Sequence, residues 1–439
     1  MRRNSKKSTN MNNSLTLEMP SQMRIDNAAN IYPASLSKYY ASLYRIYVTL
    51  SDYVDPVLLQ QALETVTERI PTFRCGLKSG TFWWHLRRLD KTPQLMPLAP
   101  LNHFHFRDNR GFLYRVSADG NRIVLDVFHA LGDGYGGEVF LMTLTGEYLR
   151  LRYGISIDYN WLVLNPSDQP VMEEFEDSFK TFFSGRNGAL EKNDDAYHIK
   201  GRKLPFGGLR DVRVVLPTEQ FLPVCKQYGC SATELLTAMM LHSLQTLHGK
   251  DNDRRRSNVL KVSVPINLRA FYSSRTLRNF SSYVNLGVDV RNGYFPLAEL
   301  ATLVKNQKRV ALLPDNLEPK IAENVALEES IAVRCLPLII KRPIIDYINR
   351  RHGDRYCSQT FSNLGNITLP TAMQPYVTGF EAVLGRQRGN SGAVACVGYG
   401  GKLYVHLSRN ISNDDFERSF LAQFEALGVA AEVSHSILA

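Results

Sequence analysis

The sequence predicts an α+β protein built from two lobes, each with antiparallel strands and helices packed on them. Two β-hairpins are expected far apart in the chain, one ending at residue 128 and one at residues 393–408. Each half also contains a long segment with the spacing of an amphipathic helix. Strands grouped in hairpins, rather than alternating singly with helices, favour α+β over α/β architecture. A chain of 439 residues is long enough for two such lobes.

The first lobe is predicted to open with a strand at residues 41–51, "ASLYRIYVTLS", where aromatic and β-branched residues are dense. "DPVLLQQALETVTERIP" predicts a helix, because Asp55 can cap it and a proline suits its first position. A strand follows in "TFWWHLRRL". "GFLYRVSADGNRIVLDVF" then predicts a hairpin that turns at residues 118–121. The next helical spacing begins at Glu138 and stops at Gly154.

The second lobe is predicted to begin with the strand "DVRVVLP", after a linker at residues 165–210 that is rich in Asp, Glu, Gly, Asn and Lys. Ser231 and Glu234 have the spacing of a capping box, and the helix behind them is expected to end at Gly249. Strands are expected in "NVLKVSVPINLR" and "SYVNLGVDV". The hairpin "AVACVGYGGKLYVHLS" and the helix "NDDFERSFLAQFEALG" complete the lobe.

These elements divide the chain into three parts. We expect a flexible basic tail at residues 1–28, a first lobe at residues 29–205 and a second lobe at residues 206–439. The most apolar stretch, "CLPLIIKRPIIDYI", is interrupted by Lys341 and Arg342 and is too short to span a bilayer. No apolar run follows the basic N-terminus, as a secretory signal would require. We therefore expect a soluble, cytoplasmic monomer without a transmembrane segment.

Composition limits the classes of partner. The net charge of +10 favours anionic partners, yet the 52 Lys and Arg are scattered and form no nucleic-acid-binding motif. We therefore expect no nucleic-acid partner. The six Cys include no C-x-x-C pair, which indicates neither a disulfide framework nor a zinc ribbon. No set of three metal ligands is evident, so no metal site is expected.

The segment "FHALGDGYGGE" supports two incompatible interpretations. Gly132, Gly134 and Gly137 spell G-x-G-x-x-G, and Asp158 follows at the distance of a ribose-binding acid, as in a dinucleotide-binding oxidoreductase. That fold requires a parallel strand before the glycines, whereas this strand is predicted to be one arm of an antiparallel hairpin. Asp133 would also place a carboxylate where the pyrophosphate approaches. The dinucleotide interpretation is therefore the minor one.

The second interpretation rests on His129 and Asp133, which spell H-x-x-x-D-G with the glycine after them. A neutral imidazole at the end of a strand can take a proton from an alcohol or amine at neutral pH. Asp133 can brace the loop through a buried ion pair. The glycines at 132 and 134 permit a sharp turn, and Gly136 and Gly137 are expected to let a ligand approach the helix.

With these residues the sequence resembles the chloramphenicol acetyltransferase-like superfamily, which includes alcohol acetyltransferases and the condensation domains of peptide synthetases. "FHALGDG" matches the H-x-x-x-D-G signature, and the resemblance extends over roughly residues 30–435 through "RIPTFR", "VPINLRAF", "LRNFSSYVNLGV" and "FSNLGNITLP". Many members have two adjacent His at the start of this motif, and the second is the base. Here Phe128 replaces the first, and His129 matches the second. The D-F-G-W-G of plant members is absent.

The resemblance implies a role for each matching residue. His129 is the expected general base, at the middle of a channel between the lobes, and Asp133 is structural, paired with Arg269 of "INLR". Gly134 belongs to the same structural motif. Ser362 and Asn363 are candidates for lining the channel or stabilising the oxyanion.

The implied function is an acyltransferase of the alcohol acetyltransferase type. It would move an acyl group, most simply acetyl, from acyl-CoA to a small hydroxyl or amine acceptor by direct attack, with no permanently bound cofactor. A second possibility is a condensation-type enzyme whose donor is a thioester on an acyl carrier protein. A possibility from another class is a non-catalytic binding module that has kept the fold.

Overall fold

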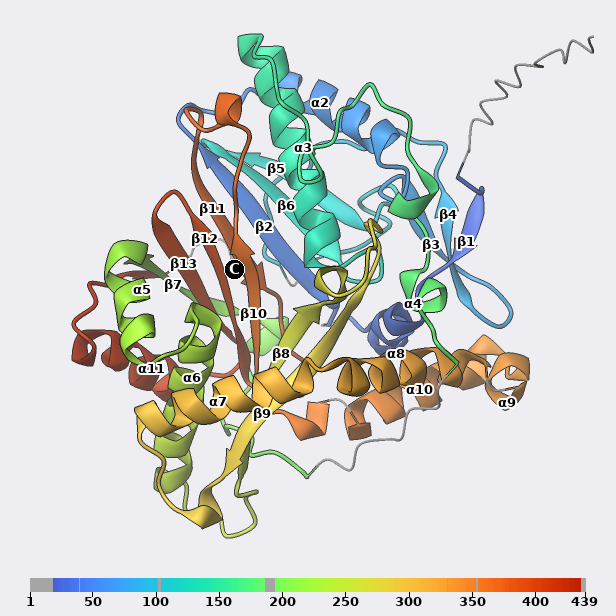
Figure 1. Ribbon diagram of the computed structural model, residues 1–439. Helices are drawn as coiled ribbons and strands as arrows, with labels where there is room; N and C mark the ends of the chain where they lie inside the picture. Colours follow the sequence, from blue (N-terminus) through green and yellow to red (C-terminus); the bar gives the residue numbers. More distant parts are fainter. Residues whose placement is uncertain are drawn as a thin grey trace, which may run out of the picture.

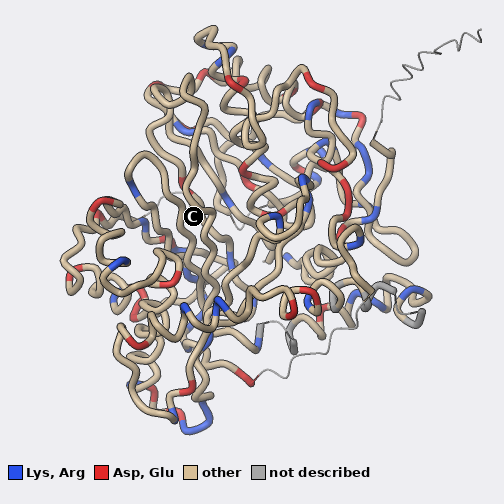
Figure 2. The backbone as a smooth tube through the Cα atoms, in the orientation of Figure 1, with Lys and Arg blue, Asp and Glu red and all other residues tan. Residues whose placement is uncertain are grey.

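The predicted two-lobed α+β fold is confirmed (Figure 1). The structure is a computed structural model that describes residues 19–435 except 39, 102–103, 186–193, 330 and 353. Three sheets of three, four and seven strands carry the two lobes. Figure 2 shows Lys and Arg distributed over both lobes rather than gathered on one face.

The first lobe is built on a four-stranded sheet in which all neighbouring strands are antiparallel. Its strands, in order, are β11 (Val377–Leu384), β2 (Leu43–Leu50), β6 (Arg122–Phe128) and β5 (Tyr114–Asp119). Helices α2 (Pro56–Arg69) and α3 (Gly134–Tyr153) pack together, and α3 lies against the sheet (Figure 1). A small antiparallel sheet joins β1 (Gln22–Arg24), β4 (Trp84–Arg88) and β3 (Cys75–Ser79).

The second lobe is built on the seven-stranded sheet. Its strands, in order, are β14 (Glu432–His435), β7 (Arg210–Pro217), β13 (Lys402–Arg409), β12 (Gly392–Tyr399), β10 (Gln359–Asn366), β8 (Val259–Asn267) and β9 (Ser281–Asp289). Among the described strands of this sheet, β10 pairs in parallel with β12 and β8, and the other pairings are antiparallel. The helices of this lobe include α5 (Thr218–Gln227), α6 (Ala232–Lys250), α7 (Leu297–Ala311) and α11 (Asp415–Ala426). The remaining helices are α1 (Ile31–Ser35), α4 (Ser178–Thr181), α8 (Pro314–Glu329), α9 (Ile331–Cys335) and α10 (Leu338–His352).

Local sequence signals account for the ends of the long helices. Asp55 accepts hydrogen bonds from two backbone amides of α2, and the capping box of Ser231 with Glu234 starts α6. Gly154 adopts φ of 65° and ends α3, a conformation that suits glycine. Two boundaries differ from the prediction, because α3 begins at Gly134 rather than Glu138 and α6 ends at Lys250.

The predicted division of the chain differs from the structure at two places. The N-terminal segment is part of the fold from Met19 onward, because β1 pairs with β4 and the side chain of Asp26 is buried. The boundary between the lobes is also crossed, since β11 comes from the second half of the chain and pairs with β2 of the first sheet. Both differences depend on pairings between residues far apart in the sequence, which local patterns do not encode.

The centre of the seven-stranded sheet is buried on both faces, and its strand β12 is buried along its whole length. Along β12, Val394 and Cys396 belong to the core beneath the helices, while Ala395 and Val397 belong to the core of the first lobe. Successive residues of a strand point to opposite faces, so one row of side chains lies between the lobes. The two lobes therefore share an interface made by the first lobe and the central part of one face of this sheet.

A buried charge cluster lies in this interface. His406 of β13 contacts Asp211 of β7 through Nδ1 at 2.6 Å and Glu381 of β11 through Nε2 at 2.8 Å. Arg213 donates to the same Glu381 at 2.6 Å. The two carboxylates raise the pKa of His406 to about 9 against the opposing effect of burial. His406 and Arg213 hold the pKa of Glu381 at about 2, although burial alone would raise it.

The charge on His406 predicts how stability changes with pH. A raised pKa means that its contribution is complete below the ordinary value of 6.5 and is lost as the pH rises through about 9. His406→Gln removes the charge and leaves Asp211 without its partner, so we expect a loss of about 3 kcal/mol in the free energy of unfolding at neutral pH. Urea unfolding monitored by circular dichroism measures this loss in the free energy of unfolding.

His435→Gln is the matched control, because His435 lies exposed on the edge strand of the same sheet. It should change the free energy of unfolding by less than about 0.5 kcal/mol. Equal stability of the His406 variant and the native chain would contradict the assigned charge state.

Candidate active site

His129 follows directly after β6, where the backbone turns toward α3. Its backbone N–H donates to the carbonyl oxygen of Ser42 at 2.9 Å, which fixes the start of the turn beside β2. The imidazole stacks on the ring of Tyr32, with centroids 4.9 Å apart and planes 18° apart. Tyr44 packs against it at 4.8 Å in a tilted orientation. Two aromatic side chains therefore define the orientation of this imidazole.

The surroundings of His129 favour its neutral form. Burial lowers the pKa of the imidazole to about 4, and the carboxylate of Asp133 with the side chain of Asn279 offsets this effect only in part. The Nδ1 atom is buried and makes no hydrogen bond of normal geometry to the part of the chain that the structure describes. A neutral imidazole can accept a proton at any pH above about 5.

Asp133 begins α3 and joins it to the second lobe. Its Oδ1 accepts from the amide of Gly136 at 3.2 Å, which makes it the N-cap of the helix. Its Oδ2 accepts from Nη1 of Arg269 at 2.8 Å and from the amide of Phe280 at 2.9 Å. The hydroxyl of Tyr44 donates to the carbonyl oxygen of Asp133 at 2.7 Å. Both oxygens of the carboxylate are thus engaged by hydrogen bonds within the protein.

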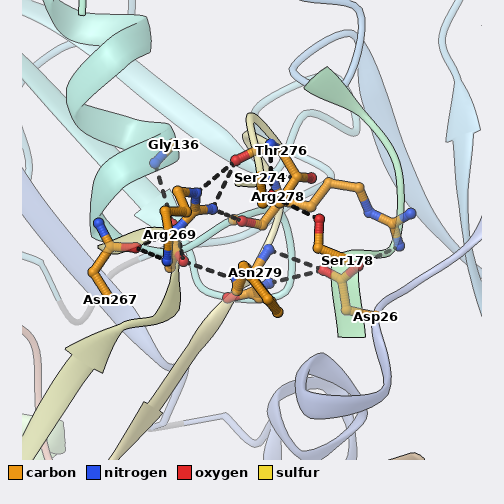
Figure 3. Close-up of polar contacts among 12 residues, drawn as sticks. Asp26, Gly136, Ser178, Asn267, Arg269, Ser274, Thr276, Arg278 and Asn279 are labelled. Atoms are coloured by element: carbon orange, nitrogen blue, oxygen red, sulfur yellow. Dashed lines mark hydrogen bonds and ion pairs between the residues drawn. The ribbon is translucent and has the colours of Figure 1, made fainter. Parts of the chain in front are cut away.

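Arg269 lies just past the end of β8, where the sequence predicts the partner of Asp133. The structure brings the two together as a buried ion pair, with each side chain 6% exposed. The guanidinium also donates to the carbonyl oxygens of Thr276 and Arg278 (Figure 3). It lies over the ring of Tyr135, 4.6 Å from the ring centroid. Arg269 therefore holds both the start of α3 and the loop that leads into β9.

The glycines of the motif serve close packing. A Cβ atom at Gly136 would lie 2.0 Å from the carbonyl oxygen of Leu277, and one at Gly132 would lie 2.6 Å from the same oxygen. A Cβ atom at Gly137 would lie 2.5 Å from the hydroxyl of Tyr44. The expectation that Gly136 and Gly137 admit a ligand is therefore wrong, because protein atoms fill that space. Gly134, by contrast, has no neighbour within 4 Å of the Cβ position.

The dinucleotide interpretation also fails on this geometry. The strand before the glycines, β6, is antiparallel to both of its neighbours. The N-terminus of α3 is already capped by the carboxylate of Asp133. A pyrophosphate would have to replace that carboxylate and the Leu277 backbone at the same position.

Three buried residues of the site are absent from the sequence analysis as functional candidates. Arg278 forms an ion pair with Asp26 at 2.7 Å, and the backbone and side-chain amides of Asn279 donate to the same carboxylate (Figure 3). The amide of Asn279 also donates to the carbonyl oxygen of His129 at 3.0 Å. Burial raises the pKa of Asp26 to about 6 in spite of Arg278. In the sequence, the only indication of this role is the polar pair Arg278 and Asn279 inside "LRNFSS", a segment that otherwise resembles an ordinary loop.

Ser362 and Asn363 lie on β10 and point to opposite faces of its sheet. Ser362 pairs with Ala395, whose side chain belongs to the core of the first lobe, so Ser362 faces the space between the lobes. Asn363 faces the helices instead, where its amide donates to the hydroxyl of Thr233 at 2.7 Å. The structure therefore keeps Ser362 on the side of the first lobe and directs Asn363 away from it.

A cavity of about 540 Å³ lies elsewhere in the second lobe. It is bordered by Val259 at the start of β8 and by Arg291 just after β9, at the strand ends opposite to the His129 site. Its charged lining is mixed and includes Asp253, Arg255 and Arg355.

Among the described residues, no group of three or more His, Cys, Asp or Glu has metal-binding geometry. No described helix has the length and apolar character needed to cross a bilayer.

Comparisons with known proteins identify the fold through structure alone. Neither the known family models nor the curated protein sequences gave a match to this chain. Among solved structures, TRI101 of F. sporotrichioides, complexed with coenzyme A and T-2, is 11% identical with a TM-score of 0.60, and the match covers 94% of this chain and 99% of that one. Polyketide synthase associated protein 5 from Mycobacterium tuberculosis is 12% identical with a TM-score of 0.59 and coverages of 91% and 96%.

A third neighbour is a variant of the starter condensation domain of rhizomide synthetase RzmA in complex with C8-CoA. It is 14% identical with a TM-score of 0.60, and the match covers 93% of this chain and 95% of that one. The fold is therefore the one shared by condensation domains and chloramphenicol acetyltransferase-like acetyltransferases, as the sequence resemblance predicts.

The contribution of the ion pair between Asp133 and Arg269 to the free energy of unfolding can be tested by substitution. Asp133→Ala removes the helix cap and leaves the guanidinium of Arg269 buried without its carboxylate, so we expect a loss of about 3 to 5 kcal/mol in the free energy of unfolding. Asp158→Ala, which truncates an exposed aspartate in the same lobe, should change it by less than about 0.5 kcal/mol. Chemical unfolding measures both, and equal effects of the two substitutions would contradict the assignment.

Proposed function

We propose that this protein transfers an acyl group from a CoA thioester to a hydroxyl or amine acceptor, with His129 as the general base. The observation that carries the proposal is the position of the His129 imidazole, which packs against the rings of two tyrosines beside the loop of the second lobe that leads into β9. Burial lowers the pKa of this imidazole and so favours the neutral form that a base requires. The fold supports the proposal, because the neighbours include a structure titled trichothecene 15-O-acetyltransferase and others complexed with CoA or C8-CoA.

The proposed reaction is one direct displacement. Nε2 of His129 accepts the acceptor's proton while the acceptor oxygen or nitrogen attacks the thioester carbonyl carbon. The C–S bond then breaks, and the imidazolium returns the proton to the departing CoA thiolate. No acyl-enzyme forms, so donor and acceptor must be bound between the lobes at the same time. Positioning the two reactants together supplies much of the rate acceleration.

Nε2 is the assigned base because Nδ1 is sealed inside the protein. Asp133 has no part in the proton transfer, since both of its oxygens are engaged by Gly136, Arg269 and Phe280. Ser362, on the side of the sheet that faces the first lobe, is the proposed donor toward the oxyanion. Asn363 is not included, because its amide is bonded to Thr233.

The test is acceptor-dependent cleavage of acetyl-CoA. The purified protein is mixed with acetyl-CoA and a panel of alcohols and amines, and loss of the thioester absorbance is followed so that the protein's own six cysteines do not interfere. His129→Ala should reduce kcat by about 10²- to 10⁴-fold, the usual contribution of a general base. His105→Ala, which truncates an exposed histidine, is the matched control and should leave the rate unchanged.

Equal rates for the His129 variant and the native protein would contradict the proposal, as would thermal stabilisation by NADH but not by CoA. A truncated donor, acetyl-phosphopantetheine, distinguishes the source of the thioester. If it reacts as well as acetyl-CoA, the nucleotide is not recognised and a carrier-protein donor replaces CoA. Absence of cleavage with every donor and acceptor would favour the non-catalytic binding module.

A further inference from the structure

One face of helix α10 is apolar and exposed to solvent. Ile339 is 85% exposed and Tyr347 is 63% exposed, which is unusual for such large apolar side chains. The residues of this face recur at helical spacing and form one stripe along three turns, which we call the α10 stripe. Its members are Ile339, Ile340, Ile344, Tyr347 and Ile348.

The opposite face of α10 is firmly packed. Lys341 is 1% exposed, its ammonium lies 3.3 Å from the ring centroid of Trp83, and it donates to the carbonyl oxygen of Phe82 at 2.9 Å. Arg342 donates to the carbonyl oxygen of Leu36 at 2.8 Å. These contacts fix the rotation of the helix and leave the side chains of the stripe exposed to solvent. The helix itself lies at the edge of the molecule (Figure 1).

The sequence around the stripe is strongly basic. Residues 331–353 contain five Lys or Arg and a single acidic residue, Asp346. That carboxylate is neutralised by an ion pair with Arg388. Of these cations Lys341 is buried on the packed face, whereas the side chains of Arg334 and Arg342 are exposed. The described part of the segment therefore combines an apolar face with two exposed arginines, and its acidic side chain is already paired.

The geometry points to α10 as an interfacial helix that seats this protein reversibly on an anionic lipid bilayer. Isoleucine side chains can enter the boundary between head groups and acyl chains, and a tyrosine suits the polar level above them. The exposed side chains of Arg334 and Arg342 meet the anionic head groups. The proposed contact is peripheral, with the stripe at the level of the head groups.

Two other occupants fit the stripe less well. A second copy docking through the same face would bring the exposed Arg334 and Arg342 of both copies together, and like charges repel across such an interface. A folded partner protein usually offers an anchor that enters a pocket, whereas this stripe is the convex side of a helix. A lipid surface needs no pocket and adapts to the stripe.

The position of α10 relates the proposed membrane contact to the candidate site. The helix packs on α1, and α1 carries Tyr32, whose ring stacks on His129. A bilayer bound at the stripe would therefore lie on the α1 side of the imidazole. Membrane binding itself does not depend on the proposed acyl transfer and is tested without it.

The experiment is vesicle flotation with the full-length protein. Vesicles of phosphatidylcholine alone are compared with vesicles of phosphatidylcholine and phosphatidylserine. We expect binding to the anionic vesicles, weakened by high salt because the electrostatic part is screened. The double variant Ile339→Gln, Tyr347→Gln should bind them at least about tenfold more weakly, since two inserted side chains are lost.

The matched control is the double variant Tyr53→Gln, Val57→Gln, which alters two side chains of similar exposure, 79% and 66%, in the first lobe. It should bind like the native protein. Both variants keep the basic N-terminal residues, so any binding by those charges alone is common to all samples. Equal melting temperatures show that the exposed substitutions leave the fold intact.

Three outcomes would overturn the inference: no binding of the native protein to either vesicle, equal binding by the stripe variant, or equal loss in the control. Dimerisation abolished by the stripe variant would assign the face to a second copy instead. Retention on an immobilised acidic peptide without vesicle binding would assign it to a protein partner. Acetyl-CoA cleavage is measured separately, so failure here does not bear on the proposed function.

Discussion

The carboxylate of Asp133 and the guanidinium of Arg269 meet where the two lobes touch, and the geometry of the candidate site depends on this pair. One oxygen of Asp133 caps α3, and the other accepts from Arg269 and from the amide of Phe280. The pair therefore fixes, at one point, the turn after β6 and the loop before β9. His129 lies on that turn, so its imidazole is placed by the contact between lobes rather than by the first lobe alone.

Two further buried charge clusters join segments that are remote in the sequence. Asp26 holds Arg278 and Asn279 beside His129, and His406 bridges strands of both sheets through Asp211 and Glu381. Buried ion pairs contribute little net stability compared with apolar packing, because desolvation opposes the attraction. Their strict geometry can instead select one arrangement of the lobes, and losing one partner leaves a buried charge uncompensated.

The sequence predicted the elements that local chemistry determines. The cap at Asp55, the box at Ser231 and the hairpin that turns at Gly120 each depend on a few neighbouring residues. His129 and Asp133 follow from the spacing and chemistry of their motif, whereas Arg269 was identified because a resemblance supplied the long-range pairing that spacing alone does not contain. The same resemblance left Ser362 and Asn363 equivalent, whereas the register of β10 with β12 separates them by face.

What the sequence could not predict depends on contacts between distant segments. β11 comes from the second half of the chain but pairs with β2 in the four-stranded sheet of the first lobe, and nothing in its sequence, "VTGFEAVL", indicates β2 as its partner. Asp26 was assigned to a flexible tail because its partners lie about 250 residues away. The glycines of the motif were expected to face a ligand, but the backbone of Leu277, from the other lobe, fills the space. Each error is a missing tertiary contact rather than a misjudged local preference.

A crystal structure of the protein with CoA bound tests most directly the proposal that a CoA thioester reacts beside His129. We expect the CoA sulfur within about 4 Å of Nε2 of His129, close enough for proton transfer between them. CoA bound instead in the cavity bordered by Arg255 and Arg291, with its sulfur remote from the imidazole, would contradict it.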